Sequence, residues 1–332
     1  MTYDTNTGIE YSNAYGTGYY FIDSKTLLVT SAGTATTSNN RDYPWYEINE
    51  NIEKVIITSD AGSIGNYEFS GYRSLKNVII EEGVTSIGRQ AFRDCSSLNH
   101  LVIPSSVTYI SDQGVFDNCN SLTSASPISE GKGTGYEYGW TDTIPANAFC
   151  GLRKLQTVSI LNTITTIGRQ AFRACTSLQE LIIPEGVTKV EGYTFYDCSS
   201  LSHLVIPSSI TSIDGNYTFN NCNSLTSASP LSENKGTGYE YGWTDTIPTQ
   251  AFADLGKLQT VSILDTITTI EYEAFRLCYS LQEVVIPDSV NTIGYRAFAN
   301  CNNLTTFKIG NGIKTIDSDA FRLYNNTDTT VY

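Results

Sequence analysis

Long hydrophobic runs, clustered basic residues and closely spaced cysteine pairs are all missing from this sequence of 332 residues. Because no run of about 18 apolar residues occurs, the sequence predicts no membrane-spanning helix. Lys and Arg number 20 against 34 Asp and Glu, which gives a formal charge of −14. Nucleic-acid-binding proteins need clustered basic side chains to release counterions from phosphates. The charge therefore argues against a nucleic-acid partner.

Charged residues make up only 16% of the chain, and Met occurs once, whereas Tyr (22) and Gly (26) are abundant. This composition is typical of a β-rich protein with an uncharged polar surface. Residues 1–5 are polar and form no apolar signal region. We therefore expect either a trimmed secreted segment with an added Met or an intracellular protein, and we favour trimming.

An internal repeat decides the predicted fold. The ordinary unit spans 23 or 24 residues and two units span 33, and the eleven units begin at Ile52, Leu75, Leu98, Leu122, Leu155, Leu178, Leu201, Leu225, Leu258, Leu281 and Leu304. Each unit has a short β-branched strand such as 101–103, a second extended segment such as 84–87, and a turn that carries Phe. A single unit cannot bury its own apolar side chains, so stacked neighbours must do so.

Stacking is expected to align equivalent residues into ladders. One ladder consists of Phe69, Phe92, Phe116, Phe149, Phe172, Phe195, Phe219, Phe252, Phe275, Phe298 and Phe321. The sequence thus predicts a leucine-rich-repeat solenoid, β-rich with short helical or 3-10 turns, wound as a right-handed curved superhelix with a parallel sheet. We predict an N-terminal cap at 1–51 that resembles a β-hairpin, the solenoid at 52–326 and a frayed tail at 327–332.

The motifs also resemble a known family. Leu98…Leu101-Val102-Ile103-Pro104 and Ile87-Gly88-Arg89-Gln90-Ala91-Phe92-Arg93-Asp94-Cys95 are similar to the BspA-like leucine-rich repeats, and the resemblance covers about residues 52–326. Members are mostly surface-exposed or secreted proteins of bacteria and protozoan parasites, linked to adhesion to host proteins, other cells or glycans. The resemblance implies an adhesion protein at the cell surface or in the medium.

The two 33-residue units contain an identical aromatic stretch, Gly-Thr-Gly-Tyr-Glu-Tyr-Gly-Trp-Thr-Asp-Thr-Ile-Pro, at 133–145 and 236–248. Insertions in repeat proteins often form loops on the binding face, and Tyr and Trp suit both protein contacts and sugar stacking. The candidate ligand-binding residues in these loops are Tyr136, Tyr138, Trp140, Tyr239, Tyr241 and Trp243. In the alternative interpretation, each insertion folds back and covers the solenoid edge, where Ala125 and Pro127 weaken the strand pattern.

The strands offer a second candidate surface. Alternation along a strand places every second side chain on the concave, solvent-facing side of the sheet. Mixed β-branched and polar side chains there could bind an extended protein partner, although any exposed strand prefers such residues. The candidate ligand-binding residues on this face are His100, Val102, Glu180, Ile182, His203, Val205 and Glu283.

No constellation of residues suggests catalysis or metal binding. The two histidines lie one super-repeat of 103 residues apart, with no Cys-His or Ser-His-Asp arrangement supported by spacing. Seven of the eight cysteines share one ladder position and no C-x-x-C spacing occurs, so buried thiols are expected rather than disulfides or zinc ligands. Cys150 departs from that ladder and is expected to be exposed. The sequence predicts no enzyme, no cofactor and no metal.

Three hypotheses for function follow. The first is a non-catalytic adhesion protein that binds a host or matrix protein, or another cell surface, through the concave face and the aromatic loops. The second is a carbohydrate-binding module whose Tyr and Trp rings stack on sugars. The third is an intracellular scaffold for protein interactions. Neither the ligand nor the oligomeric state follows from the sequence, because repeat solenoids have many kinds of partner.

Overall fold

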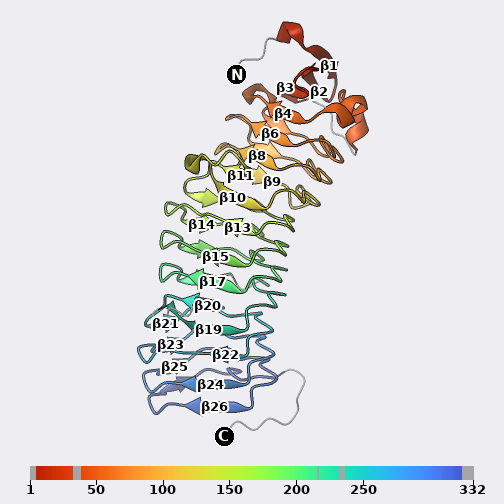
Figure 1. Cartoon of the computed structure of the whole chain (residues 1–332). Coiled ribbons are helices and arrows are strands. Elements are labelled where there is room, and N and C mark those ends of the chain that lie inside the picture. The colour runs from red at the N-terminus through yellow and green to blue at the C-terminus, as the bar shows by residue number, and fades with distance from the viewer. Residues whose placement is uncertain (1–4, 33–38, 215–216, 232–235, 324–332) are drawn as a thin grey trace. The chain divides into compact units, whose positions relative to one another are not determined.

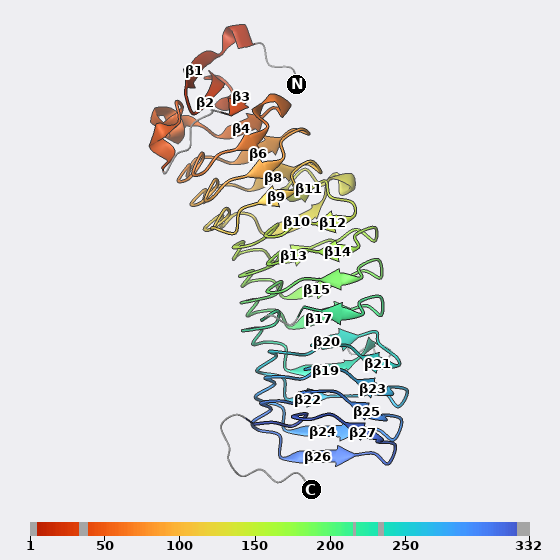
Figure 2. The same cartoon turned by 180° about the vertical axis from the view of Figure 1, so that it is seen from behind.

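The computed structural model describes residues 5–32, 39–214, 217–231 and 236–323. The chain forms two compact units, Met1–Leu161 and Asn162–Tyr332. Within each unit, parallel strands lie coil upon coil (Figure 1), and Figure 2 shows the same stacking from behind. The repeating coils predicted from the sequence period are confirmed. The predicted tail at 327–332 lies outside the described residues.

The N-terminal segment of unit 1 is an antiparallel three-stranded arrangement. Its strands are β1 (Ile9–Asn13), β2 (Gly16–Phe21) and β3 (Thr26–Ala32), and β3 then pairs in parallel with β4 (Lys54–Ile57). The indole of Trp45 is fully buried and stacks on the ring of Phe69, with centroids 6.3 Å apart. The segment therefore packs directly on the first coil, although its role as a separate cap stays a prediction.

The main sheet of unit 1 has nine strands in the order β1-β2-β3-β4-β6-β8-β11-β10-β13. After β4 its members are β6 (Asn77–Ile80), β8 (His100–Ile103), β10 (Ser124–Pro127), β11 (Gly135–Tyr138) and β13 (Thr157–Val158). The second extended segment of each coil gives β5 (Ser63–Ile64), β7 (Ser86–Ile87), β9 (Tyr109–Ile110) and β12 (Thr143–Ile144).

Unit 2 repeats this plan. Its main strands are β15 (Glu180–Ile182), β17 (His203–Ile206), β19 (Ser227–Pro230), β20 (Gly238–Tyr241), β22 (Thr260–Val261), β24 (Glu283–Ile286) and β26 (Thr306–Ile309). Its short second strands are β14 (Thr166–Ile167), β16 (Lys189–Val190), β18 (Ser212–Ile213), β21 (Thr246–Ile247), β23 (Thr269–Ile270), β25 (Thr292–Ile293) and β27 (Thr315–Ile316).

Five short 3-10 helices are described in unit 1. They are η1 (Thr5–Thr7), η2 (Asn40–Asp42), η3 (Tyr46–Asn51), η4 (Ser59–Ala61) and η5 (Ile128–Glu130). Among the described residues, no helix has the length and hydropathy needed to cross a bilayer.

The Phe ladder forms the centre of the core. In unit 1 the rings of Phe69, Phe92 and Phe116 stack at centroid distances of 5.5 and 6.1 Å. The inner rings are at most 1% exposed, and burial of each contributes about 1.5–3 kcal/mol. Phe321, on the last described coil, is only half-buried, and Ile316 there is 45% exposed. The ladder is therefore complete only where a coil has a neighbour on both sides.

The cysteines form a second ladder beside the rings. The thiol of Cys95 donates to the carbonyl oxygen of Phe69 on the preceding coil at 3.1 Å, and Cys198 and Cys301 make the same bond to Phe172 and Phe275. All eight cysteines are buried and none forms a disulfide. The exposure expected for Cys150 is wrong, since its side chain is buried, with 9% exposed. Burial raises the pKa of the Cys95 thiol well above its usual value.

Each Phe of the ladder from Phe69 to Phe298 is flanked by left-handed backbone two residues before and two residues after it. Ala174, for example, follows Phe172 with φ of 60°, and Gly71 follows Phe69 with φ of 81°. The residue two positions before the ring is in this conformation too, with φ of 60° at Gln170. Because non-glycine residues adopt it at a cost, the stacking of the coils must stabilise these turns.

Candidate functional site

Each aromatic insertion forms a strand inside the main sheet, not a projecting loop. Strand β11 lies between β8 and β10 and is parallel to both, so that Tyr136 aligns with Leu101 on one side and with Ala125 on the other. Strand β20 lies between β17 and β19 in the same register. A 33-residue unit thus contributes two strands to the sheet where other units contribute one.

The expectation that the insertion rings lie on exposed loops is wrong. The side chains of all six aromatic candidates are 0–4% exposed: Tyr136, Tyr138, Trp140, Tyr239, Tyr241 and Trp243. The ring of Tyr136 lies between Phe116 and Phe149, with centroid distances of 5.6 and 5.0 Å. An extra strand widens the gap between consecutive Phe rings, and Tyr136 fills that gap.

The polar atoms of the buried rings bond to backbone carbonyls of the coils around them. The hydroxyl of Tyr136 donates to the carbonyl of Ala148 at 2.8 Å, and the indole N–H of Trp140 donates to the carbonyl of Val107 at 2.8 Å. The second insertion makes equivalent bonds from Tyr239, Tyr241 and Trp243. Buried polar groups are costly without partners, so these contacts indicate a structural role.

The glycines of the insertion explain its composition. Gly135 has φ of 78°, and a Cβ there would lie 2.5 Å from Oγ of Ser124. A Cβ on Gly139 would lie 2.7 Å from the backbone nitrogen of Ser105. The glycine-rich pattern that suggests a flexible loop is therefore required by close packing of the extra strand.

The outward side chains of the main strands are the second candidate surface, which we name the exposed sheet face. In unit 2, Ile182 is 57% and Val285 50% exposed. The adjacent carboxylates of Glu180 and Glu283 are also exposed, with 59% and 53% of each side chain accessible. These residues, predicted to lie on the solvent-facing side, do so. In unit 1, Val102 is half-buried.

Two histidine–glutamate pairs interrupt this face beside the insertions. In unit 1, Nε2 of His100 lies 3.0 Å from Oε2 of Glu137, and the Glu137 carboxylate also accepts the N–H of Gly133. In unit 2, His203 makes the same contact with Glu240.

The carboxylate of Glu180 provides a second contact for His203, at 3.2 Å from its Nδ1. Both histidines are mostly buried, with 17–19% of each side chain accessible. No group of three or more His, Cys, Asp and Glu residues among the described residues could hold a metal ion. The contacts of His100 with Glu137 and of His203 with Glu240 join each insertion to the neighbouring strand.

Val205 was predicted to lie on the exposed sheet face. The prediction is wrong, because Val205 is only 8% exposed. It is in register with Glu240, which is buried and whose carboxylate accepts the N–H of Gly236. The insertion thus covers part of the surface that the alternation of the strand would leave open.

A cleft lies at the ends of β24 and β26 in unit 2. Its volume is about 540 Å³, and its lining includes the apolar side chains of Val285 and Ile309 together with Asp288 and Lys308. Lys308 forms an ion pair with Glu283 at 3.1 Å. The cleft places an apolar floor between charged groups, next to the exposed sheet face.

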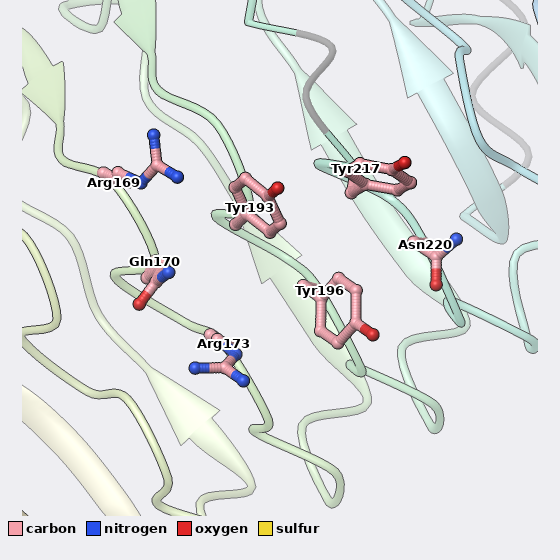
Figure 3. Close-up of a pocket in the computed structure, with 7 residues that line it drawn as sticks. All are labelled: Arg169, Gln170, Arg173, Tyr193, Tyr196, Tyr217 and Asn220. Carbon is pink, nitrogen blue, oxygen red and sulfur yellow. The ribbon is translucent and has the colours of Figure 1, made fainter. Parts of the chain in front are cut away.

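A second hollow was missed by the sequence analysis and lies on the turns that carry the Phe ladder. Figure 3 shows its seven lining residues on three successive coils of unit 2, and we name it the tyrosine–arginine pocket: Arg169, Gln170, Arg173, Tyr193, Tyr196, Tyr217 and Asn220. Its volume is about 460 Å³. A signal was available, since Tyr193 and Tyr217 occupy the position two residues before Phe on consecutive coils.

Within this pocket, cations stack on rings. The guanidinium of Arg169 lies 4.7 Å from the ring centroid of Tyr193, and that of Arg173 lies 5.6 Å from the ring centroid of Tyr196. Tyr193 contacts both other tyrosines, at 6.0 Å from Tyr196 and 5.5 Å from Tyr217. The rings are tilted against one another by 42° and 36° and form a continuous aromatic wall.

Comparisons with known proteins identify one matching family and solved structures of the same fold. The family profile described as "BspA type Leucine rich repeat region (6 copies)" matches residues 41–133, 142–240 and 245–331. A search of curated proteins found no match. A solved leucine-rich repeat protein from Bacteroides ovatus is 20% identical with a TM-score of 0.52, and the alignment covers 94% of this chain and 91% of that chain.

Two further solved structures are similar over most of their length. A leucine-rich repeat protein from Eubacterium ventriosum is 21% identical with a TM-score of 0.47, with 97% of both chains covered. A leucine-rich cell surface protein from Faecalibacterium prausnitzii is 23% identical with a TM-score of 0.35, with 91% of this chain and 94% of that chain covered.

Proposed function

Because this chain belongs to the BspA-type leucine-rich repeat family, we propose that it is a non-catalytic binding protein that contacts a protein partner through its exposed sheet face. The single observation that carries the proposal is the exposure of Ile182 and Val285, at 57% and 50%, on strands whose alternate side chains are buried. Solvent-exposed β-branched residues on a rigid sheet supply contact area without an ordering cost on binding.

The cleft beside Val285 supports this proposal. Binding energy at protein interfaces concentrates where an anchor side chain of the partner enters a desolvated pocket. Val285 and Ile309 form apolar lining there, while Asp288 and Lys308 can fix the orientation of polar groups on the partner. An extended segment along the sheet would place one side chain in this cleft and others over Ile182.

We further propose that the protein acts at a cell surface or after secretion, and that its partner is a matrix protein or a protein of another cell surface. The basis is its family, whose members are mostly surface-exposed or secreted. Protease treatment of intact source cells tests the location, because a surface protein is degraded while a cytosolic marker survives. Protection of the protein in intact cells would instead favour an intracellular scaffold.

Binding can be tested with the full chain and immobilised basement-membrane matrix. The double variant Ile182→Thr with Val285→Thr keeps the β-branched shape and removes apolar contact, and we expect at least a fivefold loss of affinity, about 1 kcal/mol. Ile316→Thr is the matched control, because Ile316 is 45% exposed on the other strand ladder of unit 2. Equal affinities of the double variant and the wild type would contradict the proposal.

A further inference from the structure

We propose that the tyrosine–arginine pocket of unit 2 binds an acidic saccharide, a sugar that carries a carboxylate. This site is independent of the exposed sheet face, since its lining residues lie on the turns around the Phe ladder. Its volume of about 460 Å³ is within the range of about 300–1,000 Å³ common for small-ligand sites.

The charge of the pocket indicates an anionic ligand. Arg169 and Arg173 line it, no acidic residue is among its lining residues, and the chain as a whole has a charge of −14. Neither guanidinium forms an ion pair with a carboxylate of the described residues, although Arg276 and Arg296 on later coils do. Arginine N–H groups match a carboxylate in a two-pronged geometry, so these side chains are suited to an external anion.

The neutral groups of the pocket indicate a sugar. Tyr217 is 48% exposed, so a face of the aromatic wall is open to the C–H face of a pyranose ring. Oε1 of Gln170 is buried and has no hydrogen-bond partner, and the amide of Asn220 also lines the hollow. Amide groups both donate and accept, as sugar hydroxyls do. A carboxylate side chain of an acidic peptide would match the arginines but has no flat C–H face to lie on the open ring of Tyr217.

The fold does not require this cluster. The hexapeptide Gly-Arg-Gln-Ala-Phe-Arg occurs at 168–173 in the pocket and, unchanged, at 88–93 in unit 1. The coil after 88–93 has Gly114 and Asp117 where the coil after 168–173 has Tyr193 and Tyr196. The arginines of unit 2 thus face tyrosines on the coil that follows them and those of unit 1 do not, although both sites share the Phe and Cys ladders.

Variants for the test come from equivalent positions in other coils, so the fold tolerates them. Glutamine takes the left-handed position two residues before Phe at Gln90 and Gln250, which makes Tyr193→Gln with Tyr217→Gln a conservative double variant. Arg169→Gln removes one cation. Tyr67→Gln is the matched control, because Tyr67 has φ of 62° at the same position in unit 1 and also lies under an arginine, Arg89.

Calorimetric titration of the full chain would use paired probes: oligogalacturonide against its methyl ester, and sialyllactose against lactose. We expect at least one acidic sugar to bind, its neutral counterpart to bind at least tenfold more weakly, and the tyrosine double variant and Arg169→Gln each to lose at least tenfold in affinity. Tyr67→Gln should bind as the wild type does. Circular dichroism would confirm that each variant is folded.

Four results would overturn the proposal. They are no binding of either acidic sugar, equal binding of an acidic sugar and its neutral counterpart, equal binding of a poly-glutamate peptide, and unchanged affinity of the tyrosine double variant. Because none of these variants lies on the exposed sheet face, the outcome is separate from that of the matrix-binding experiment.

Discussion

Replacement of Trp140 tests whether the insertion belongs to the core. The variant Trp140→Ala loses an indole that is 3% exposed and stacks on the ring of Tyr138, with ring centroids 5.5 Å apart. It also leaves the carbonyl of Val107 without the 2.8 Å hydrogen bond from the indole N–H. A ligand-binding loop would tolerate this change, whereas a packed strand would not.

The expected magnitude follows from the two losses. Removal of a buried Trp side chain costs about 3–5 kcal/mol, because a cavity remains where the ring was. Trp140→Phe keeps most of the burial and removes mainly the hydrogen bond, so it should cost about 1–3 kcal/mol. With a denaturant dependence of about 1–3 kcal/mol/M, Trp140→Ala should lower the urea midpoint by about 1–5 M.

Urea unfolding followed by far-ultraviolet circular dichroism measures this difference. Tyr109→Ser is the matched control, because Tyr109 is 60% exposed and the equivalent residues in β5 and β7 are Ser63 and Ser86. The control should unfold within about 0.5 kcal/mol of the wild type. If Trp140→Ala unfolded at the same urea concentration as the control, the structural assignment of the insertion would be refuted.

Two other predictions concern unit 1 and the turns. Burial raises the pKa of Glu68 from 4.5 to about 8. The folded state therefore favours the protonated carboxyl. The free energy of unfolding should be highest below pH 4.5 and should fall by on the order of 3–5 kcal/mol as the pH rises to 8. Glu68→Gln should reduce the difference in unfolding free energy between urea titrations at pH 5 and pH 8. An unchanged difference would contradict the role of Glu68 in this pH dependence. Ala174→Gly should raise the free energy of unfolding by about 0.5–1 kcal/mol, because glycine adopts φ of 60° without strain. Gly71→Ala should lower it by a similar amount. Calorimetry showing the opposite signs would exclude strain at these turns.

The ladders could be predicted from the sequence because they depend only on spacing. A Phe that recurs every 23 or 24 residues must stack on its equivalents once coils repeat, and Phe172 and Phe195 do so at 5.8 Å. The buried thiols follow from the same period, as Cys198 shows by its bond to Phe172. Exposure of Ile182 on the sheet also follows, since alternation along a strand is a local property.

The tyrosine–arginine pocket was missed for a different reason. Its residues occupy equivalent positions on successive coils, so the repeat places them side by side. Within any one coil, however, they form no motif that indicates a site. Only the stacking brings the guanidinium of Arg169 over Tyr193 and places Tyr217 beside that ring. A comparison of equivalent positions across coils, made column by column, would have shown the change from Gln170 to Tyr193.

The period of the chain thus specified which residues form the core of each ordinary coil, since side-chain burial there depends on near neighbours in an unvarying stack. It did not specify where the rings of the 33-residue units lie. A segment rich in Gly, Tyr and Trp suits an exposed loop or a packed strand equally well. The outcome depends on the space between Phe116 and Phe149 and on the carbonyls of Val107 and Ala148, which only the folded coils bring within reach of the insertion.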